Sequence, residues 1–180
     1  MGQSQDWTII QQLGDVILTK IHGCIFEIGI GKSTPILKKF ADDFKRDLYC
    51  LDVRGYKCKW AESVGCKALI GKTKHTLKLF PKISVAMGLI DGRHDVHTVR
   101  FEVNFFLDLL TPGGIIFMHD TYLPTNRKPK KGTMAGDIYK VRQELEMRED
   151  VQTFTWPYTA MDQGLTMVMK KELDRPYYRQ

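Results

Sequence analysis

The chain has 180 residues, enough for one complete hydrophobic core and too few for two ordinary domains, so we expect residues 1–180 to form a single domain. Its hydrophobic fraction of 43% excludes a wholly disordered chain. The net charge of +6 suits anionic ligands but does not by itself indicate nucleic-acid binding.

The chain shows no signal peptide and no apolar run long enough to span a membrane, which predicts a cytoplasmic protein without a membrane partner. The four cysteines include no CxxC pair, so neither a zinc site nor a redox motif is indicated. Cys24 and Cys50 lie in apolar runs, where we expect them to be buried. We interpret the basic residues 126–131 as a solvated loop, with a contact to substrate or nucleic acid as the alternative.

Short apolar runs alternate with amphipathic ones from about residue 24, which is typical of βα units and a mainly parallel sheet. The predicted elements are strand 25–30, helix 35–44, strand 48–53, helix 57–64, strand 68–70, helix 73–80, strand 85–90, helix 97–110, strand 115–118, helix 134–147 and strands 151–156 and 165–169. The last two strands have no helical pattern between them and predict an antiparallel hairpin. The predicted fold is therefore an α/β, Rossmann-like, mainly parallel seven-stranded sheet with helices on both faces and a C-terminal antiparallel hairpin.

A glycine-containing turn follows the first predicted strand, at residues 27–34, and leads into a helix. Such a turn lets the backbone approach a ligand closely at a positively polarised helix N-terminus. A dinucleotide-binding GxGxxG motif would need a glycine in place of Thr34, and a phosphate-binding P-loop would need one in place of Phe26, inside the strand. A third interpretation is a loop that binds S-adenosylmethionine.

Two further segments suit a nucleoside ligand. Asp52 ends the second predicted strand, 21 residues after Gly31, where a carboxylate can accept hydrogen bonds from both hydroxyls of a ribose. The segment Gly71–Lys72–Thr73 follows the third strand and is expected near the adenine, with a plain turn as the alternative.

Two motifs narrow the comparison to a family. They are Asp91-Gly92-Arg93-His94, after the fourth strand, and His119-Asp120-Thr121, after a Pro-Gly-Gly turn and the fifth strand. Together with Glu27, Gly29, Gly31 and Ser33, they resemble the class I S-adenosylmethionine-dependent methyltransferases, in the branch that includes catechol O-methyltransferase and antibiotic-sugar O-methyltransferases. With the C-terminal segment 162–165, the resemblance covers about residues 24 to 171.

The resemblance implies an S-adenosylmethionine cofactor and a set of site residues. The cofactor-binding residues would be Glu27, Gly29, Gly31, Ser33, Thr34, Asp52, Gly71, Lys72, Thr73 and Asp91. The carboxyl ends of the strands face the ligand crevice in an open α/β sheet, and Asp91, His94 and Asp120 all fall there. We expect His94 to be the catalytic base, with Asp91 as a second catalytic residue, because a neutral imidazole can accept the acceptor's proton.

A divalent cation at this edge of the sheet is a further possibility. Asp91 and Asp120 could bind Mg²⁺, although two carboxylates make a thin site and His119 and Thr121 stand where relatives supply another oxygen ligand. The alternative is that Asp120 caps the following loop and Asp91 contacts only the cofactor.

Other polar and aromatic residues are expected to be structural. We expect Glu102 to be a solvent-facing charge, and His22, His75 and His97 to be surface or packing residues. Tyr122, Trp156 and Tyr158 could wall an acceptor pocket, but packing in the core or at the sheet edge is the favoured interpretation.

These observations predict an O-methyltransferase for a small hydroxylated acceptor, such as a sugar or a phenol. Its pocket would be shallow, formed by residues 122–134 or completed by a second subunit in a homodimer. One alternative is a nucleotide- or nucleic-acid-binding module of the same fold without transferase activity; a nucleic-acid partner is not the favoured expectation. Another is a P-loop nucleotidase that uses Lys32. The absence of an NPPY-type motif argues against methylation of nucleobase amino groups.

Overall fold

A computed structural model describes residues 5–122, 136–157 and 164–171. In these residues, the chain forms one seven-stranded sheet with the order β3-β2-β1-β4-β5-β7-β6. The strands are β1 (Cys24–Ile28), β2 (Leu48–Asp52), β3 (Lys67–Ile70), β4 (Val85–Ile90), β5 (Leu110–His119), β6 (Val151–Trp156) and β7 (Leu165–Lys170). Strands β1 to β5 are parallel, whereas β7 pairs antiparallel with both β5 and β6. The predicted fold class and the C-terminal hairpin are confirmed.

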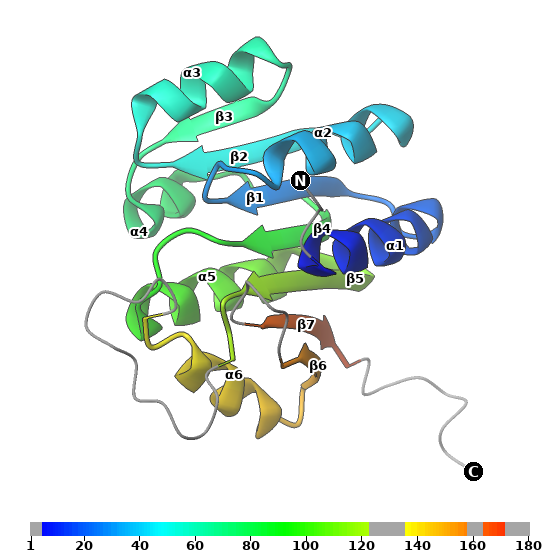
Figure 1. The fold of residues 1–180 in the computed structure, drawn as a ribbon, viewed down its shortest axis with the longest axis vertical. Coiled ribbons are helices and arrows are strands. Elements are labelled where there is room, and N and C mark those ends of the chain that lie inside the picture. The colour runs from blue at the N-terminus through cyan, green and yellow to red at the C-terminus, as the bar shows by residue number, and fades with distance from the viewer. Residues whose placement is uncertain (1–4, 123–135, 158–163, 172–180) are drawn as a thin grey trace.

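Helices cover both faces of the sheet (Figure 1). They are α1 (Gln5–Lys20), α2 (Thr34–Asp43), α3 (Gly55–Ser63), α4 (Thr73–Thr76), a 3₁₀ turn η1 (Leu77–Leu79), α5 (Val96–Leu109) and α6 (Tyr139–Glu146). The helices α1, α2 and α3 pack against one face, whereas η1, α5 and α6 pack against the other. The molecule therefore has three layers, as βα units require when both faces of a sheet are apolar.

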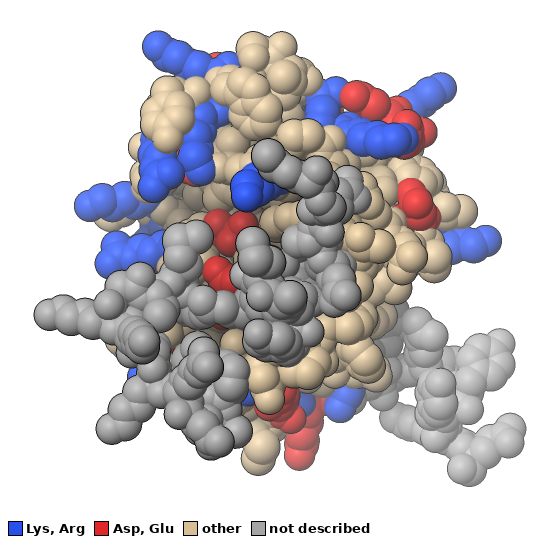
Figure 2. All heavy atoms as spheres, viewed as in Figure 1, with Lys and Arg blue, Asp and Glu red and all other residues tan. Residues whose placement is uncertain are grey.

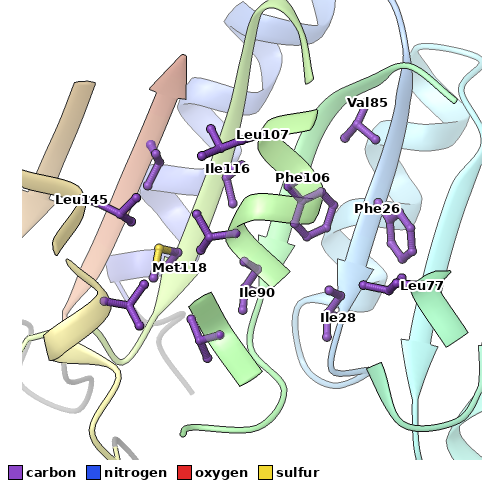
Figure 3. Packing of buried hydrophobic residues seen from close by; sticks show 14 of the residues in the cluster. Phe26, Ile28, Leu77, Val85, Ile90, Phe106, Leu107, Ile116, Met118 and Leu145 are labelled. Carbon is purple, nitrogen blue, oxygen red and sulfur yellow. The ribbon is translucent and has the colours of Figure 1, made fainter. Parts of the chain in front are cut away.

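The central strands are mostly apolar because both of their faces are covered. Every residue of β1 and β4 is buried. On the face of the sheet that α5 covers, Phe26 of β1 meets Phe106 of α5 edge to face, with 5.4 Å between ring centroids (Figure 3). Gly88 of β4 leaves room for this ring, since a Cβ there would lie 3.1 Å from it. This core fixes the carboxyl ends of β1 and β4 next to each other.

The structure differs from the sequence-based expectations at two elements. The helix α1 was not predicted, although Ile10, Leu13, Ile17 and Leu18 follow helical spacing and pack on the sheet. The strand β5 begins at Leu110, directly after α5, instead of at residue 115. The Pro-Gly-Gly turn lies inside β5 and interrupts the regular pairing of β5 with β4. Val85 pairs with Leu110, and the pairing resumes with Met87 and Ile115.

Of the predicted helix 134–147, the described part contains α6, from Tyr139 to Glu146. All four cysteines are buried, as expected for Cys24 and Cys50, and none of them forms a disulfide bond. Across the described ranges, no helix has both the length and the apolar character needed to cross a membrane.

Candidate active site

The glycine turn after β1 brings the ends of β1 and β4 into contact. Gly29 has φ +99°, and a Cβ placed on it would lie 2.1 Å from the carbonyl oxygen of Asp91. Only glycine fits this close approach. The backbone N–H of Asp91 donates to the carbonyl of Ile28 at 2.8 Å, which ties the two strand ends together.

The turn is held from its inner side by a buried carboxylate. Glu27 is fully buried and accepts hydrogen bonds from the hydroxyls of Ser33 and Thr34, the second at 2.7 Å. The Thr34 hydroxyl also accepts from the backbone N–H of Gly31 at 3.0 Å. Burial raises the pKa of Glu27 to about 7, although the hydrogen bonds from Ser33 and Thr34 lower it in part. Three residues predicted to bind the cofactor thus shape the turn from within.

The outer side of the turn is open. A Cβ on Gly31 would meet nothing closer than 4.0 Å, so the backbone here is accessible to a ligand. The neighbouring strand β2 ends in Asp52, whose Oδ1 accepts from the backbone N–H of Arg54 at 2.8 Å. Its Oδ2 lies 3.3 Å from the ammonium group of Lys57, which also donates to the carbonyl of Ile30 in the glycine turn. Lys57 therefore links the glycine turn to the acid at the end of β2.

The segment after β3 forms the next side of the site. Gly71 has φ +149° and its backbone N–H donates to the carbonyl of Asp52 at 3.1 Å. Lys72 is exposed and precedes α4, which begins at Thr73. Glu102 of α5 lies behind this segment, near the Thr73 hydroxyl, and burial raises its pKa to about 8.

The prediction for Glu102 was therefore wrong, because its side chain is fully buried and does not face solvent. The helical spacing of α5 indicates the reason: Glu102 shares its buried face with Val99, Val103 and Phe106. By contrast, His22, His75 and His97 are exposed, as expected.

Two carboxylates and an imidazole converge where β4 and β5 end. His94 lies between them, with Nε2 3.5 Å from Asp91 Oδ1 and Nδ1 3.4 Å from Asp120 Oδ2. One ligand atom from each of the three side chains lies within 4.8 Å of the other two. Burial raises the pKa of Asp91, but His119 and His94 more than offset this, so its pKa lies below the ordinary value. Asp91 is therefore held as a carboxylate.

The structure adds two residues that the sequence-based prediction did not include. His119 is buried, with Nδ1 3.5 Å from Asp91 Oδ1 and 3.3 Å from Asp120 Oδ1. Its ring stacks on Trp7 of α1, with 5.1 Å between centroids and 5° between planes. The position of His119 beside Asp120 was a usable signal, because the last residues of a central parallel strand lie at the ligand edge. Trp7 could not be placed without α1.

The backbone around this cluster is locked from two sides. Asp120 has φ +57°, a left-handed conformation that Asp tolerates better than most residues. Beyond it, Thr121 is buried and bonds to Thr166 of β7 at 2.7 Å through their hydroxyls. On the other side, Gly136 packs so closely on His94 that a Cβ would lie 1.8 Å from the His94 carbonyl oxygen. The positions of Asp120 and His94 therefore depend on separate parts of the fold.

The site as a whole lies along the carboxyl edge of β1 to β5. The structure brings together the predicted glycine turn, Asp52, the 71–73 segment and the Asp91–His94–Asp120 cluster on this one edge. Trp156 packs against the core on the α1 side of the sheet. Residues 126–131, most of the predicted pocket segment 122–134, and Tyr158 and residues 162–163 lie outside the described residues.

Comparison with known proteins identifies the family of the chain. The model of a family described as a methyltransferase domain matches residues 26–121, more than half of the chain and the part that carries the site. The chain therefore belongs to this methyltransferase family. No curated protein sequence matches it.

Solved structures share the fold at low sequence identity. The O-methyltransferase TomG from Streptomyces achromogenes, in complex with SAM, is 15% identical, with a TM-score of 0.73 over 95% of this chain and 82% of that one. An O-methyltransferase from Bacillus cereus, in complex with SAH, is 15% identical, with a TM-score of 0.73 over 95% and 83%. Cofactor-bound Rv0187 from MTB is 13% identical, with a TM-score of 0.76 over 94% and 81%. The Rossmann-like methyltransferase fold is thus confirmed.

Proposed function

We propose that this methyltransferase transfers the methyl group of S-adenosylmethionine to a hydroxyl group of a small acceptor, such as a sugar or a phenol. The observation that carries the proposal is the placement of His94 between two carboxylates, at the same sheet edge as an open glycine turn and the acid of β2. The two O-methyltransferases named above, of the same fold, support this choice of acceptor chemistry.

The proposal assigns a role to each group of residues at the carboxyl edge of the sheet. The backbone at Gly29 and Gly31 lies against the aminoacyl end of the cofactor, and Asp52 accepts from the ribose hydroxyls. The 71–73 segment faces the adenine, and Asp91 borders both cofactor and acceptor. Glu27, Ser33 and Thr34 keep the turn in shape instead of facing the ligand, as their mutual hydrogen bonds indicate.

The acceptor hydroxyl must lose a proton as the methyl group arrives. S-adenosylmethionine, when bound, supplies an electrophilic methyl group on a sulfonium centre. Nε2 of His94, on the side of Asp91, takes the proton from the hydroxyl, and the carboxylate of Asp120, 3.4 Å from Nδ1, stabilises the imidazolium that forms. The carboxylates of Asp91 and Asp120 fix the orientation of the ring. Holding the acceptor in line is the remaining task of the site.

Calorimetric titration with S-adenosylhomocysteine tests the cofactor assignment. We expect saturable binding with one site per chain, and Asp52→Asn should weaken it. Transfer of labelled methyl groups to a panel of sugars and catechols then tests the acceptor class. Binding of S-adenosylhomocysteine without transfer to any hydroxylated acceptor would contradict the proposed acceptor; no binding at all would contradict the whole proposal.

A divalent cation is a second proposal for the same cluster. The support for it is the convergence of Asp91, His94 and Asp120 within 4.8 Å. This set has two oxygen donors and one nitrogen donor, which suits Mn²⁺ or Zn²⁺ better than Mg²⁺, since Mg²⁺ prefers oxygen ligands in near-ideal octahedral geometry. The cation would lower the pKa of the acceptor hydroxyl, and His94 would then be a ligand and not the base.

Chelation separates the two assignments of His94. If the cation is essential, EDTA should abolish transfer and Mn²⁺ should restore it. Mn²⁺ should also raise the melting temperature of the metal-free protein, and Asp120→Asn should remove that shift. Transfer that persists in EDTA, with no melting shift, assigns His94 to proton removal.

The acceptor pocket needs walls besides the described edge. Completion of the pocket by a second subunit stays a prediction. Gel filtration with light scattering tests it, since a monomer at working concentrations contradicts it.

A further inference from the structure

The outer face of α3 carries exposed aromatic and cationic side chains side by side. Tyr56 and Trp60 are 69% and 41% exposed, and their i, i+4 spacing places them on one face of the helix. Lys59 is also exposed, and its i+3 spacing from Tyr56 adds a cation to the same face. The opposite face of α3 packs on the sheet through Cys58 and Ala61. The aromatic rings are thus not part of the core.

Further cations border this face at the carboxyl ends of β2 and β3. Asp52 pairs with Ile70 in the sheet, so Arg54 and Lys72, each two residues further on, lie at neighbouring strand ends. Arg54, Lys72 and Lys74 are exposed, and none of them forms an ion pair with any described residue. Figure 2 shows Lys and Arg side chains along the left-hand edge of the view, where the strands β1 to β4 of Figure 1 end.

The segments that form this surface contain one acidic residue, Glu62 of α3. Residues 29–34, 53–63 and 71–76 include six Lys and Arg residues and one Glu. Their positions are Lys32, Arg54, Lys57, Lys59, Lys72 and Lys74. Other exposed carboxylates, such as Asp43, Asp47 and Asp108, lie on the amino side of the sheet, at helix ends or just before strands. These segments therefore carry a net positive charge, which favours an anionic partner.

The combination of exposed rings with unpaired cations favours single-stranded nucleic acid over the other polyanions. Bases stack on Tyr and Trp, while the cations track the phosphates. An anionic membrane surface would need a continuous apolar face, and Lys59, Glu62 and Ser63 interrupt that face of α3. We propose that the α3 surface, defined by Arg54, Tyr56, Lys59 and Trp60, binds single-stranded nucleic acid together with Lys74, which follows β3 at the same carboxyl edge of the sheet. This binding goes beyond the proposed transfer reaction and does not depend on it.

Fluorescence anisotropy with labelled 12-nucleotide oligo-U and oligo-dT, without cofactor, tests the proposal. We expect saturable binding of both strands that weakens as salt increases. The triple variant Arg54→Gln/Lys59→Gln/Lys74→Gln should reduce the slope of log affinity against log salt by about 2, at about 0.7 per lost phosphate contact. The matched control, Lys20→Gln/Lys45→Gln/Lys82→Gln, removes three exposed cations at the amino edge and should leave the slope unchanged.

The aromatic side chains provide a second, independent measurement. Tyr56→Ala/Trp60→Ala should weaken binding at least about tenfold with the salt slope unchanged, because stacking does not release counterions. Circular dichroism melts check that each variant is folded, and residues 126–131 are the same in all variants. The proposal is overturned if neither strand binds, if both triple variants behave alike, or if the protein binds phosphatidylserine vesicles and not oligonucleotides.

Discussion

The ammonium group of Lys57 lies 3.3 Å from the carboxylate of Asp52 and also donates to the carbonyl of Ile30. One side chain from α3 therefore connects the glycine turn after β1 with the acid at the end of β2. Both partners belong to the proposed cofactor site. The separation of the two strand ends, and the direction in which Asp52 points, are set in part by this contact.

Replacement of Lys57 by methionine should weaken cofactor binding. Asp52 would lose the cation that orients it, and we expect the Kd for S-adenosylhomocysteine to rise about five- to tenfold, about 1 to 1.4 kcal/mol. The KM for S-adenosylmethionine should rise with kcat nearly unchanged, and Lys57→Arg should restore part of the affinity. As a control, Lys39→Met removes an exposed ion pair with Asp43 and should have no effect. An unchanged Kd in Lys57→Met would show that the contact does not position Asp52.

The two glycines of the turn should respond differently to alanine. Gly29→Ala places a Cβ 2.1 Å from the Asp91 carbonyl oxygen at φ +99°, and should lower the free energy of unfolding by at least about 2 kcal/mol. Gly31→Ala meets open space and should change stability by less than about 0.5 kcal/mol. It should nevertheless weaken S-adenosylhomocysteine binding at least tenfold, since the ligand needs that space. Urea denaturation and calorimetry measure both; equal stabilities for the two variants would refute this description of the turn.

His94→Gln should slow methyl transfer without loss of cofactor binding. Loss of a positioned general base costs about 10²- to 10⁴-fold in rate, and we expect kcat to fall within this range. The Kd for S-adenosylhomocysteine should stay within threefold, because His94 faces Asp91 and Asp120. His97→Gln, an exposed histidine three residues away, serves as the control. Full activity at saturating acceptor in His94→Gln would exclude both proposed roles of His94.

The buried Glu102 should make stability depend on pH. Its pKa is about 8 in the folded protein and 4.5 for an ordinary glutamate, so the folded chain holds a proton that the unfolded chain releases in this window. Stability therefore falls as pH rises from about 4.5 to 8, and the contribution of Glu102 is complete only below that window. Glu102→Gln should gain at least about 1 kcal/mol relative to the native chain between pH 5 and pH 8.

Urea denaturation at pH 5, 6, 7 and 8 measures this effect. Glu27, whose pKa is raised to about 7, also makes stability fall as pH rises. Because Glu27 is present in both the native chain and Glu102→Gln, the difference between their stabilities isolates the contribution of Glu102. In the control variant Glu149→Gln, at an exposed position, the free energy of unfolding should change with pH as it does in the native chain. Parallel curves for Glu102→Gln and the native chain would show that Glu102 is ionised in the folded state.

Most of the sheet could be predicted because its strands are short apolar runs between strong turn signals. The carboxyl ends of β1, β2, β4 and β5 follow from that order alone, and with them the shared edge that holds Asp52, Asp91 and Asp120. The helix α1 was missed because residues 1–14 are mostly polar, although Trp7, Ile10 and Leu13 already follow helical spacing. Without α1, the stacking of Trp7 on His119 could not be anticipated.

The contacts between side chains could not be predicted from the sequence. The direction in which Glu27 points, inward to Ser33 and Thr34, depends on the conformation of the turn and not on the motif. The link from Lys57 to Ile30 joins residues 27 positions apart and has no local signal. The helical spacing of α5 places Glu102 on the buried face. Charged residues are nevertheless seldom fully buried, so a surface position was the expected one.

The backbone on either side of residues 123–135 is fastened to the site independently of that stretch. Thr121 is bonded to Thr166 and to the carbonyl of Gly164, while Asp137 receives the backbone N–H of Val96 at 2.7 Å and Gly136 rests on His94. We therefore predict that substitutions, insertions or deletions between these two anchors leave Asp120 and His94 in place. Under the proposal that this segment helps to form the acceptor pocket, such changes would alter acceptor preference and leave the chemistry unchanged.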